Sequence, residues 1–403
     1  MPRTPSKLRP WLALAISLAA GIPAIFIVAP APTRSLLPLG VGAPEVSAWL
    51  AAIAVVALGV ALLDVRQRLL ARITAGIAVL VIATSTVPFV RITGLADSAD
   101  AQLRDAFGAT YLARIPMVRR IQFRSAPLVI GDLFRGLGAQ AAQIRITRGV
   151  PVARVDGVTL TTDIYQPEAA GSYPVLVQIY GGAWQRGTPD DFSEFAEHMA
   201  ALGFVVFAID YRHAPQFRFP AQTEDIRRDL AWIGANATAW NADTSRMVLL
   251  GRSAGAHLAM LAAFAPDAPH IRGVISFYGP VDLIEGYRVP PVPDPLDVRD
   301  IEEKFIGGTP DALPAQYRAA SPIALATRAL PPTLLLYGGR DHIVEARFGA
   351  TLAAQLRRVG TPVVHLELPQ SEHAYDVIPN GPAGQLSRYV VERFVAAAVS
   401  DAR

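Results

Sequence analysis

The chain has 403 residues; 52% of them are hydrophobic, only 18% are charged, and the formal net charge is +3. This composition excludes a disordered or low-complexity protein, because such chains lack the apolar residues needed to fold. The absence of cysteine excludes disulfides, thiolate catalysis and cysteine-ligated metal sites. The small net charge gives no reason to expect a nucleic-acid partner. The apolar excess must therefore fill a large core or lie in a bilayer.

This excess is concentrated near the N-terminus, in three windows that contain no charged side chain: Trp11–Val28, Val46–Leu63 and Ile73–Val90. A helix of about 18 residues spans roughly 27 Å, close to the thickness of the hydrocarbon core of a bilayer. Buried helices of a soluble bundle normally keep a polar stripe, and these windows have none. We therefore expect residues 1–92 to be a membrane anchor with three transmembrane helices, at about 11–28, 46–63 and 73–90.

The positive charges around these windows indicate an orientation. They precede the first window and lie between the second and third, at Arg3, Lys7, Arg9, Arg66, Arg68 and Arg72. The loop between the first and second windows carries only Arg34. The positive-inside rule then puts the N-terminus in the cytoplasm and the chain after the third window outside. If the first window is instead a cleaved signal peptide, ending near Ala29-Pro30-Ala31, the later domain is still outside. We expect an integral protein of the plasma membrane with its main domain on the extracytoplasmic side.

Residues 93–142 form a connecting region that mixes arginines with apolar residues, as in YLARIPMVRRIQF. One interpretation is an interfacial helix that lies on anionic headgroups. The other is a pair of amphipathic helices packed on the following domain. Pro116 and Pro127 keep either helix short, and we favour the second interpretation.

From about residue 143 the pattern changes to short apolar runs that alternate with helical segments. The later runs are almost continuously apolar, which is typical of parallel strands covered on both faces. The expected strands are 144–150, 159–165, 175–180, 204–209, 247–250, 273–277, 333–337 and 363–368. This alternation predicts an α/β fold with a doubly wound, mostly parallel sheet over residues 143–403. An insertion at about 282–320, Pro-rich at first, interrupts the alternation, and we expect it to cap the carboxyl ends of the strands.

The strongest catalytic motif is Gly251-Arg252-Ser253-Ala254-Gly255, which follows the strand RMVLL and precedes the helix AHLAMLAAFA. Small residues around the serine permit a tight turn that exposes its hydroxyl. The N-terminus of the following helix offers N–H groups to an oxyanion. The sequence therefore predicts Ser253 as a nucleophile.

A nucleophilic serine needs a general base, and the chain has only seven histidines. His198 and His270 lie away from the expected strand ends, and His213 lies in a turn. His257 is on the helix after the serine, His342 is beside the expected acid, and His365 is inside a strand. His373 remains, in the loop between the last strand and the last helix. Asp341 follows the strand TLLLY and lies between Ser253 and His373 in the chain, although it is also a possible helix N-cap. We expect these three residues to form a triad.

A tetrahedral intermediate also needs hydrogen-bond donors. The strand PVLVQIY runs directly into Gly181-Gly182-Ala183-Trp184. Small residues in such a turn let backbone N–H groups point at a ligand, whereas a plain glycine turn has no such role. The position of the turn after this strand favours an oxyanion hole.

Together these segments resemble the hormone-sensitive-lipase-like esterases of the α/β-hydrolase superfamily. The resemblance covers roughly residues 150–400. It rests on YGGAW at 180–184, DYRHAP at 210–215, GRSAG at 251–255, GGRDHIV at 338–344 and SEHAYD at 371–376. The resemblance implies that the backbone N–H groups of Gly182, Ala183 and Ala254 form the oxyanion hole. No metal or organic cofactor is implied.

Three residues depart from the pattern of that family. Its usual His-Gly-Gly-Gly begins here with Tyr180, and the third glycine is Ala183. Backbone N–H donation survives the second change if the φ angle suits alanine. The residue before the nucleophile is commonly acidic and here is Arg252, which would either favour acidic substrates or pair with a neighbouring carboxylate. The GGxW form is also similar to the oxyanion motif of kynurenine-formamidase-like enzymes, which are close variants together with BD-FAE-like ones.

The expected function is that of a membrane-anchored serine hydrolase that cleaves small-molecule or lipid esters, with short or medium acyl chains, through an acyl-enzyme. One alternative is an arylformamidase or related amidase. Another is a non-catalytic binding module on a hydrolase fold. The expected partners are the ester substrate and the bilayer, and nothing in the sequence indicates an oligomeric state.

Overall fold

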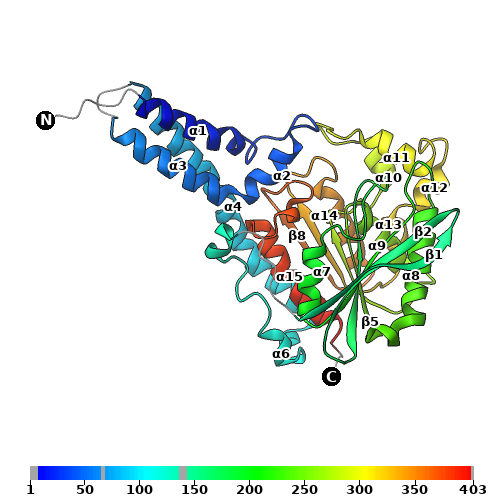
Figure 1. Cartoon of the computed structure of the whole chain (residues 1–403). Helices are drawn as coiled ribbons and strands as arrows, with labels where there is room; N and C mark the ends of the chain where they lie inside the picture. Colours follow the sequence, from blue (N-terminus) through cyan, green and yellow to red (C-terminus); the bar gives the residue numbers. More distant parts are fainter. Residues whose placement is uncertain (1–7, 65–68, 136–142, 401–403) are drawn as a thin grey trace.

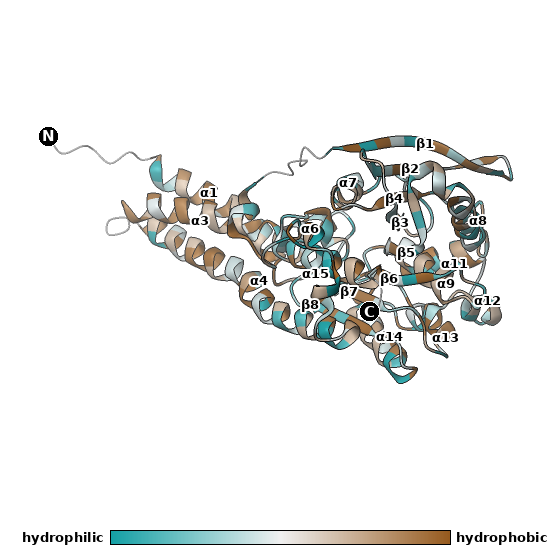
Figure 2. Cartoon of the chain, turned by 90° about the horizontal axis from the view of Figure 1, so that it is seen from below, coloured by the Kyte–Doolittle hydropathy of each residue, from teal (hydrophilic) through white to brown (hydrophobic). Residues whose placement is uncertain are grey.

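The structure is a computed structural model that describes residues 8–64, 69–135 and 143–400. It has two regions, a bundle of N-terminal helices and an α/β domain (Figure 1). The bundle projects from one side of the domain and is apolar over much of its length (Figure 2). Four of the positive residues on which the expected orientation depends lie outside the described residues: Arg3, Lys7, Arg66 and Arg68.

Three helices form the bundle: α1 (Arg9–Ile25), α3 (Ser47–Leu62) and the first half of α4 (Leu69–Phe107). The short helix α2 (Leu37–Glu45) joins α1 to α3 at the end of the bundle that lies against the α/β domain (Figure 1). Small side chains let the helix backbones approach closely. Those buried at the contacts include Ala20, Ala24, Ala54, Ala57 and Ala78.

The expected membrane spans fall on these three helices, but only α4 is long and apolar enough to cross a bilayer by itself. α1 has 17 residues and α3 has 16, and α3 reaches the length of a span only together with α2, at a bend of 79°. The described residues thus hold one such helix, or up to two if the bent pair is one span. The structure differs from the three expected spans because α1 gives way to turns after Ile25 and α2 turns away from the axis of α3. The first two uncharged windows are longer than the helices α1 and α3.

Helix α4 also continues through the boundary expected at residues 92–93. Its second half packs on strand β8 (Val363–Leu368) and on α15 (Pro382–Ala398), and Ala99 and Leu103 are fully buried there. Pro88 lies inside the helix without ending it, and membrane helices tolerate such a proline. The anchor and the connecting region therefore share one helix.

The rest of the connecting region consists of α5 (Tyr111–Arg114), α6 (Met117–Arg120) and the 3-10 helix η1 (Ile130–Phe134). Tyr111, Ile115 and Phe123 are buried and belong to the core of the α/β domain. This stretch therefore packs on the domain, and its last residues, 136–142, lie outside the described part of the chain.

An eight-stranded sheet forms the centre of the α/β domain, in the order β1-β2-β4-β3-β5-β6-β7-β8. β1 pairs antiparallel with β2, β2 pairs antiparallel with β4, and the remaining neighbours are parallel. This arrangement confirms the predicted α/β class and mostly parallel sheet. Besides β8, the strands are β1 (Ile144–Val155), β2 (Val158–Pro167), β3 (Tyr173–Ile179), β4 (Val205–Ile209), β5 (Ala242–Arg252), β6 (Ile271–Phe277) and β7 (Thr333–Gly338).

One group of helices packs along the strands of the sheet, and a second group forms a cap at one end of the strands. Those that pack along the strands, besides α15, are α7 (Ser193–Ala201), α8 (Ala221–Asn236), α9 (Ala254–Phe264) and α14 (Ala346–Arg358). The insertion between β6 and β7 forms a cap on the same side of the domain as α2 (Figure 1). Its helices are α10 (Leu283–Arg288), α11 (Val298–Ile306), α12 (Pro314–Ala319) and α13 (Pro322–Leu325).

Candidate active site

Ser253 lies at a sharp turn between β5 and α9. Its backbone has φ 53° and ψ −121°, a strained conformation for a residue other than glycine. Two glycines allow the turn to form. A Cβ on Gly251 would lie 2.2 Å from the carbonyl oxygen of Gly255, and a Cβ on Gly255 would lie 2.2 Å from that of Ile179. Strand, turn and helix therefore present the Ser253 hydroxyl at the carboxyl end of a central strand.

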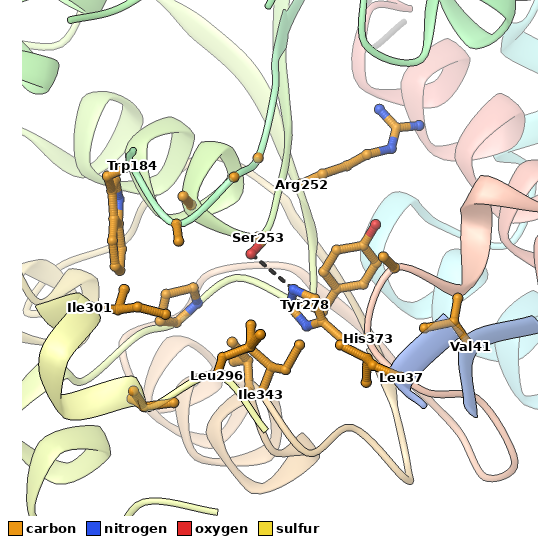
Figure 3. Close-up of a pocket in the computed structure, with 18 of the residues that line it drawn as sticks. Leu37, Val41, Trp184, Arg252, Ser253, Tyr278, Leu296, Ile301, Ile343 and His373 are labelled. Atoms are coloured by element: carbon orange, nitrogen blue, oxygen red, sulfur yellow. Dashed lines mark hydrogen bonds between the residues drawn. The ribbon is translucent and has the colours of Figure 1, made fainter. Parts of the chain in front are cut away.

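His373 and Asp341 continue a hydrogen-bonded chain from Ser253 (Figure 3). Nε2 of His373 lies 2.9 Å from Oγ of Ser253, and Nδ1 lies 2.8 Å from Oδ2 of Asp341. The other oxygen of Asp341 accepts the N–H groups of Ile343 and Val344 at 2.8 and 2.7 Å. Burial raises the pKa of Asp341, and the adjacent imidazole opposes that shift. The structure thus brings together the three residues of the expected triad.

The other histidines have different surroundings. His198 and His342 pair with Glu392 and Glu372. His257 is buried, accepts the Trp184 indole N–H at Nδ1 and lies 2.6 Å through Nε2 from the carbonyl oxygen of Ala320. Burial lowers the pKa of His257 to about 4. It is the packed histidine that its place on the helix predicted.

The turn after β3 faces the nucleophile. A Cβ on Gly181 would lie 3.1 Å from the Cβ of Ser253, so the two turns approach each other closely. Gly182 and Ala183 both have positive φ, 123° and 57°. The left-handed conformation of Ala183 costs about 1 kcal/mol relative to glycine but keeps its N–H in place.

The three N–H groups implied by the resemblance lie on these two turns. Among the described residues, the N–H groups of Gly182 and Ala183 donate to no backbone carbonyl. Ala254 is the first residue of α9, where an N–H group has no intrahelical acceptor. All three donors are therefore available to an oxyanion next to Ser253.

Tyr180 braces the oxyanion turn from its first position. Its hydroxyl donates to Asp210 at 2.5 Å and lies 2.9 Å from Nε2 of His213. Its ring stacks on Tyr211 with centroids 4.4 Å apart. The DYRHAP segment, in which the sequence indicated only a structural turn, thus holds the turn that carries the oxyanion donors.

Arg252 pairs with a carboxylate, which is one of the two roles expected for it. Its Nε donates to Asp376 at 2.6 Å, and both side chains are buried. Tyr278 donates to the other oxygen of Asp376, and its ring lies 4.5 Å from that of His373. In Figure 3 the guanidinium of Arg252 points away from Ser253. Arg252 therefore holds the chain just after His373.

Two glutamates hold the chain just before that histidine. Glu372 accepts the backbone N–H groups of His342 and His373 and also pairs with the His342 ring at 2.6 Å. Glu45, from α2, accepts the Ser371 hydroxyl at 3.2 Å and the N–H groups of Ala383 and Gly384 at the start of α15. The histidine loop is therefore fixed in part by a residue of the N-terminal region.

A cavity of about 850 Å³ opens beside Ser253 and His373 (Figure 3). This volume is typical of sites for small organic molecules. In Figure 3, Trp184 and Ile301 lie on one side of the serine, and Leu37 and Val41 of α2 lie on the other. Most of the lining residues are apolar, and many of the apolar ones come from α2, from the cap and from the stretch that leads into α14. They include Leu37, Pro38, Val41, Leu296, Val298, Ile301, Ile343, Val344 and Phe348.

The contribution of α2 was not predicted from the sequence. Leu37 and Val41 are four positions apart and share a helix face. However, the segment LPLGVGAPE contains two glycines and two prolines, which favour a loop rather than a helix. No sequence motif links this segment to residues so much later in the chain.

The sheet order, the serine turn and the triad geometry define an α/β-hydrolase fold. Solved esterase structures share it. A bacterial heroin esterase superposes with a TM-score of 0.58 at 24% identity, over 68% of this chain and 89% of that one. An esterase of Pyrobaculum calidifontis superposes with a TM-score of 0.56 at 21% identity, over 71% and 99% of the two chains.

Sequence comparisons point to the same superfamily. A family model described as BD-FAE matches residues 162–356, a range that includes Ser253 and Asp341. Over 242 residues the chain is 31% identical to LipM, a probable carboxylic ester hydrolase of Mycobacterium tuberculosis, and 30% identical to the esterase LipQ of the same organism. Each alignment covers 57% of this chain and 55% or 54% of the relative, so the chain spans about half the length of the curated relatives it matches. Over these ranges the chain is similar to esterases of the α/β-hydrolase superfamily.

Proposed function

We propose that this protein is a membrane-anchored serine hydrolase that cleaves carboxylic esters with short or medium acyl chains. The observation that carries the proposal is the hydrogen-bonded chain from Ser253 through His373 to Asp341, at a strand-to-helix turn. The mostly apolar cavity beside it suits the acyl chain of an ester. The esterase names of the matched relatives support the same reaction class.

The first half of the proposed reaction forms an acyl-enzyme. Oγ of Ser253 attacks the ester carbonyl while Nε2 of His373 takes its proton, and the charge that develops on the carbonyl oxygen is met by the backbone donors of the two turns. The histidine then gives the proton to the departing alcohol. Asp341 fixes the imidazole tautomer and stabilises the imidazolium cation.

The second half of the reaction releases the acid. A water molecule attacks the acyl-enzyme, His373 takes its proton, and the proton returns to Oγ of Ser253 as the acyl bond breaks. An N-formyl aromatic amide would react by the same steps: a formyl-enzyme forms, and His373 gives the proton to the departing aromatic amine. Ester and formamide substrates are therefore separated by measured kcat/KM and not by the catalytic groups.

The anchoring part of the proposal rests on the bundle. Its helices bury small residues against one another and expose larger apolar side chains, among them Val55, Val56, Val79 and Leu80. A bilayer satisfies such a surface. The arginines between α3 and α4 favour a cytoplasmic position for that connection, so α4 would carry the chain across the bilayer to an extracytoplasmic α/β domain. Retention in the membrane pellet after alkaline carbonate extraction, together with cleavage of the domain by protease added to intact cells, tests both points.

The catalytic part is tested with Ser253→Ala. We expect turnover of p-nitrophenyl esters by the detergent-solubilised protein to fall at least about 10³-fold, and labelling of Ser253 by a fluorophosphonate to disappear. Full turnover by the variant would refute the serine mechanism. A wild-type protein that the probe does not label would instead be a binding module, and higher kcat/KM on N-formyl aromatic amides would make the protein an amidase.

A further inference from the structure

A buried carboxyl group that the proposed reaction does not use lies under the cap. Glu302, on α11, is only 3% exposed, and its Oε2 atom has no hydrogen-bond partner among the described residues. Glu302 and Asp282 both line the cavity that holds Ser253. A second carboxyl group therefore faces the same space as the triad without belonging to it.

The cap is shaped to hold this carboxyl group against the cavity. Gly286, on α10, also lines the cavity, and a Cβ on this residue would lie 3.0 Å from Oε1 of Glu302. The hydroxyl of Tyr317 on α12 is buried nearby and likewise lacks a partner among the described residues. Glycine at 286 thus leaves room for the carboxyl group, and the polar groups around it are unsatisfied.

The surroundings of Glu302 disfavour its charged form when no cation is bound. Burial raises the pKa of Glu302 well above its usual value, and the negative charge of Asp282 adds to the shift. Within the described part of the chain, Glu302 forms no ion pair. Arg299 of α11 donates to the carbonyl oxygens of Tyr287 and Arg288, and Arg288 pairs with Asp311. A buried carboxyl group without a partner is destabilising, and a bound ammonium group would remove that penalty.

We propose that Glu302 and Asp282 form a subsite for a protonated amine carried by the ester substrate. The subsite rests on the proposed function, because the ester group must reach Ser253 while the amine is held under the cap. The ammonium donates hydrogen bonds to the carboxylate of Glu302, and Asp282 adds a second negative charge. Because this contact is remote from the reacting carbonyl, it strengthens substrate binding and acts mainly on KM.

The test compares p-nitrophenyl esters of ω-amino acids with the n-alkanoates in which a methyl group replaces the ammonium, and with the ω-hydroxy esters. In the wild-type protein we expect a kcat/KM ratio of amino ester to alkanoate that falls roughly tenfold or more in Glu302→Gln, mostly through KM. Asp282→Asn keeps an N-cap for α10 and should lower the ratio less. Because each ratio compares two substrates on one protein, a general loss of folding or activity cancels.

Glu303→Gln is the matched control. Glu303 is the next residue on α11, it accepts the Tyr287 hydroxyl, and it does not line the cavity. A glutamine can still accept that hydrogen bond, so we expect the amino-ester ratio to stay at its wild-type value.

A thermal-shift arm with n-hexylammonium and n-hexanol makes the inference independent of turnover. Stabilisation by the ammonium alone, lost in Glu302→Gln, supports the subsite even if no ester is cleaved and the proposed function fails. If the wild-type protein cleaves alkanoates but does not favour the amino esters, the function stands and the subsite is refuted. Equal preference for the hydroxy esters would also refute a cation site.

Discussion

The two regions of this chain arrange their apolar residues in opposite ways. In the bundle, the positions buried between helices are mostly alanine, and larger side chains such as Val56 and Leu80 face outward. In the α/β domain the large side chains are buried, among them Phe207, Leu249 and Phe264. Water drives large apolar side chains inward, whereas in lipid helices associate through small residues. The surface of the α/β domain therefore suits water, and the surface of the bundle suits lipid.

The largest effect should come from a cavity in the α/β domain. Leu249 is fully buried on the central strand β5, so Leu249→Ala should lower the free energy of unfolding by about 2–5 kcal/mol. In the bundle the opposite change should be harmful: Ala57→Leu should cost about 1–3 kcal/mol, because the helices meet at this alanine. Thermal unfolding in detergent measures both. A stabilised Ala57→Leu protein would mean that the helices of the bundle are not closely packed.

A charge on the outer surface should distinguish the two regions next. Val56 of the bundle is 57% exposed and Val292 of the cap is 90% exposed. An arginine near the centre of a membrane helix costs about 2.5–3.5 kcal/mol, whereas an exposed substitution in water usually changes stability by under about 0.5 kcal/mol. Val56→Arg should therefore reduce the amount of protein in the membrane fraction, and Val292→Arg should not. Equal yields of the two variants would contradict a bundle placed in lipid.

The contact between the regions should show a smaller effect. Glu45→Ala leaves the N–H groups of Ala383 and Gly384 and the Ser371 hydroxyl without their acceptor. We expect a loss of about 1–3 kcal/mol in stability. Because Ser371 lies two residues before His373, ester turnover should fall as well. Glu45→Gln keeps an acceptor oxygen and is the control, and it should retain more activity than the alanine variant.

The smallest effect is a pH dependence that belongs to the α/β domain. The hydrogen bond to Glu372 raises the pKa of His342 above its usual value. Its stabilising contribution is therefore complete below the unfolded pKa of about 6.5 and is lost as pH rises through the higher folded value. The free energy of unfolding of the wild-type protein should exceed that of His342→Gln by more at about pH 5.5 than at about pH 8.5. The change should be under about 1 kcal/mol because the pair is partly exposed, and melting temperatures of both proteins at the two pH values follow it. A difference that grows with pH would have the wrong sign.

The sheet could be predicted well because buried parallel strands are uniform apolar runs. The ends of the strands are less apolar, and their positions depend on pairing with neighbouring strands. For this reason β5 begins at Ala242, where it pairs with Tyr173, and not at Met247 as expected. The three triad residues could be predicted from the sequence for a similar reason. Each of its residues follows a strand end, and the topology brings those ends together.

Other parts of the site could not be predicted from the sequence, because they depend on packing between residues far apart in the chain. The α11 sequence VRDIEEKFI reads as an exposed charged helix, and only the folded cap buries Glu302 while leaving Glu303 near the surface. The wall formed by α2 joins residues near position 40 to a cavity built by residues beyond 180. Neither relation leaves a periodic pattern in the chain.

One consequence of the α2 wall concerns what a protease could release. A cut between Arg135 and Ile144 would separate the polypeptide into two pieces, yet Leu37, Val41 and Glu45 would remain part of the substrate chamber and of the seat of α15. The C-terminal piece could then dissociate from the bundle only by losing the side of the cavity that α2 forms. The proposed reaction would therefore stay where the bundle is, because noncovalent contacts as well as the chain hold the two regions together.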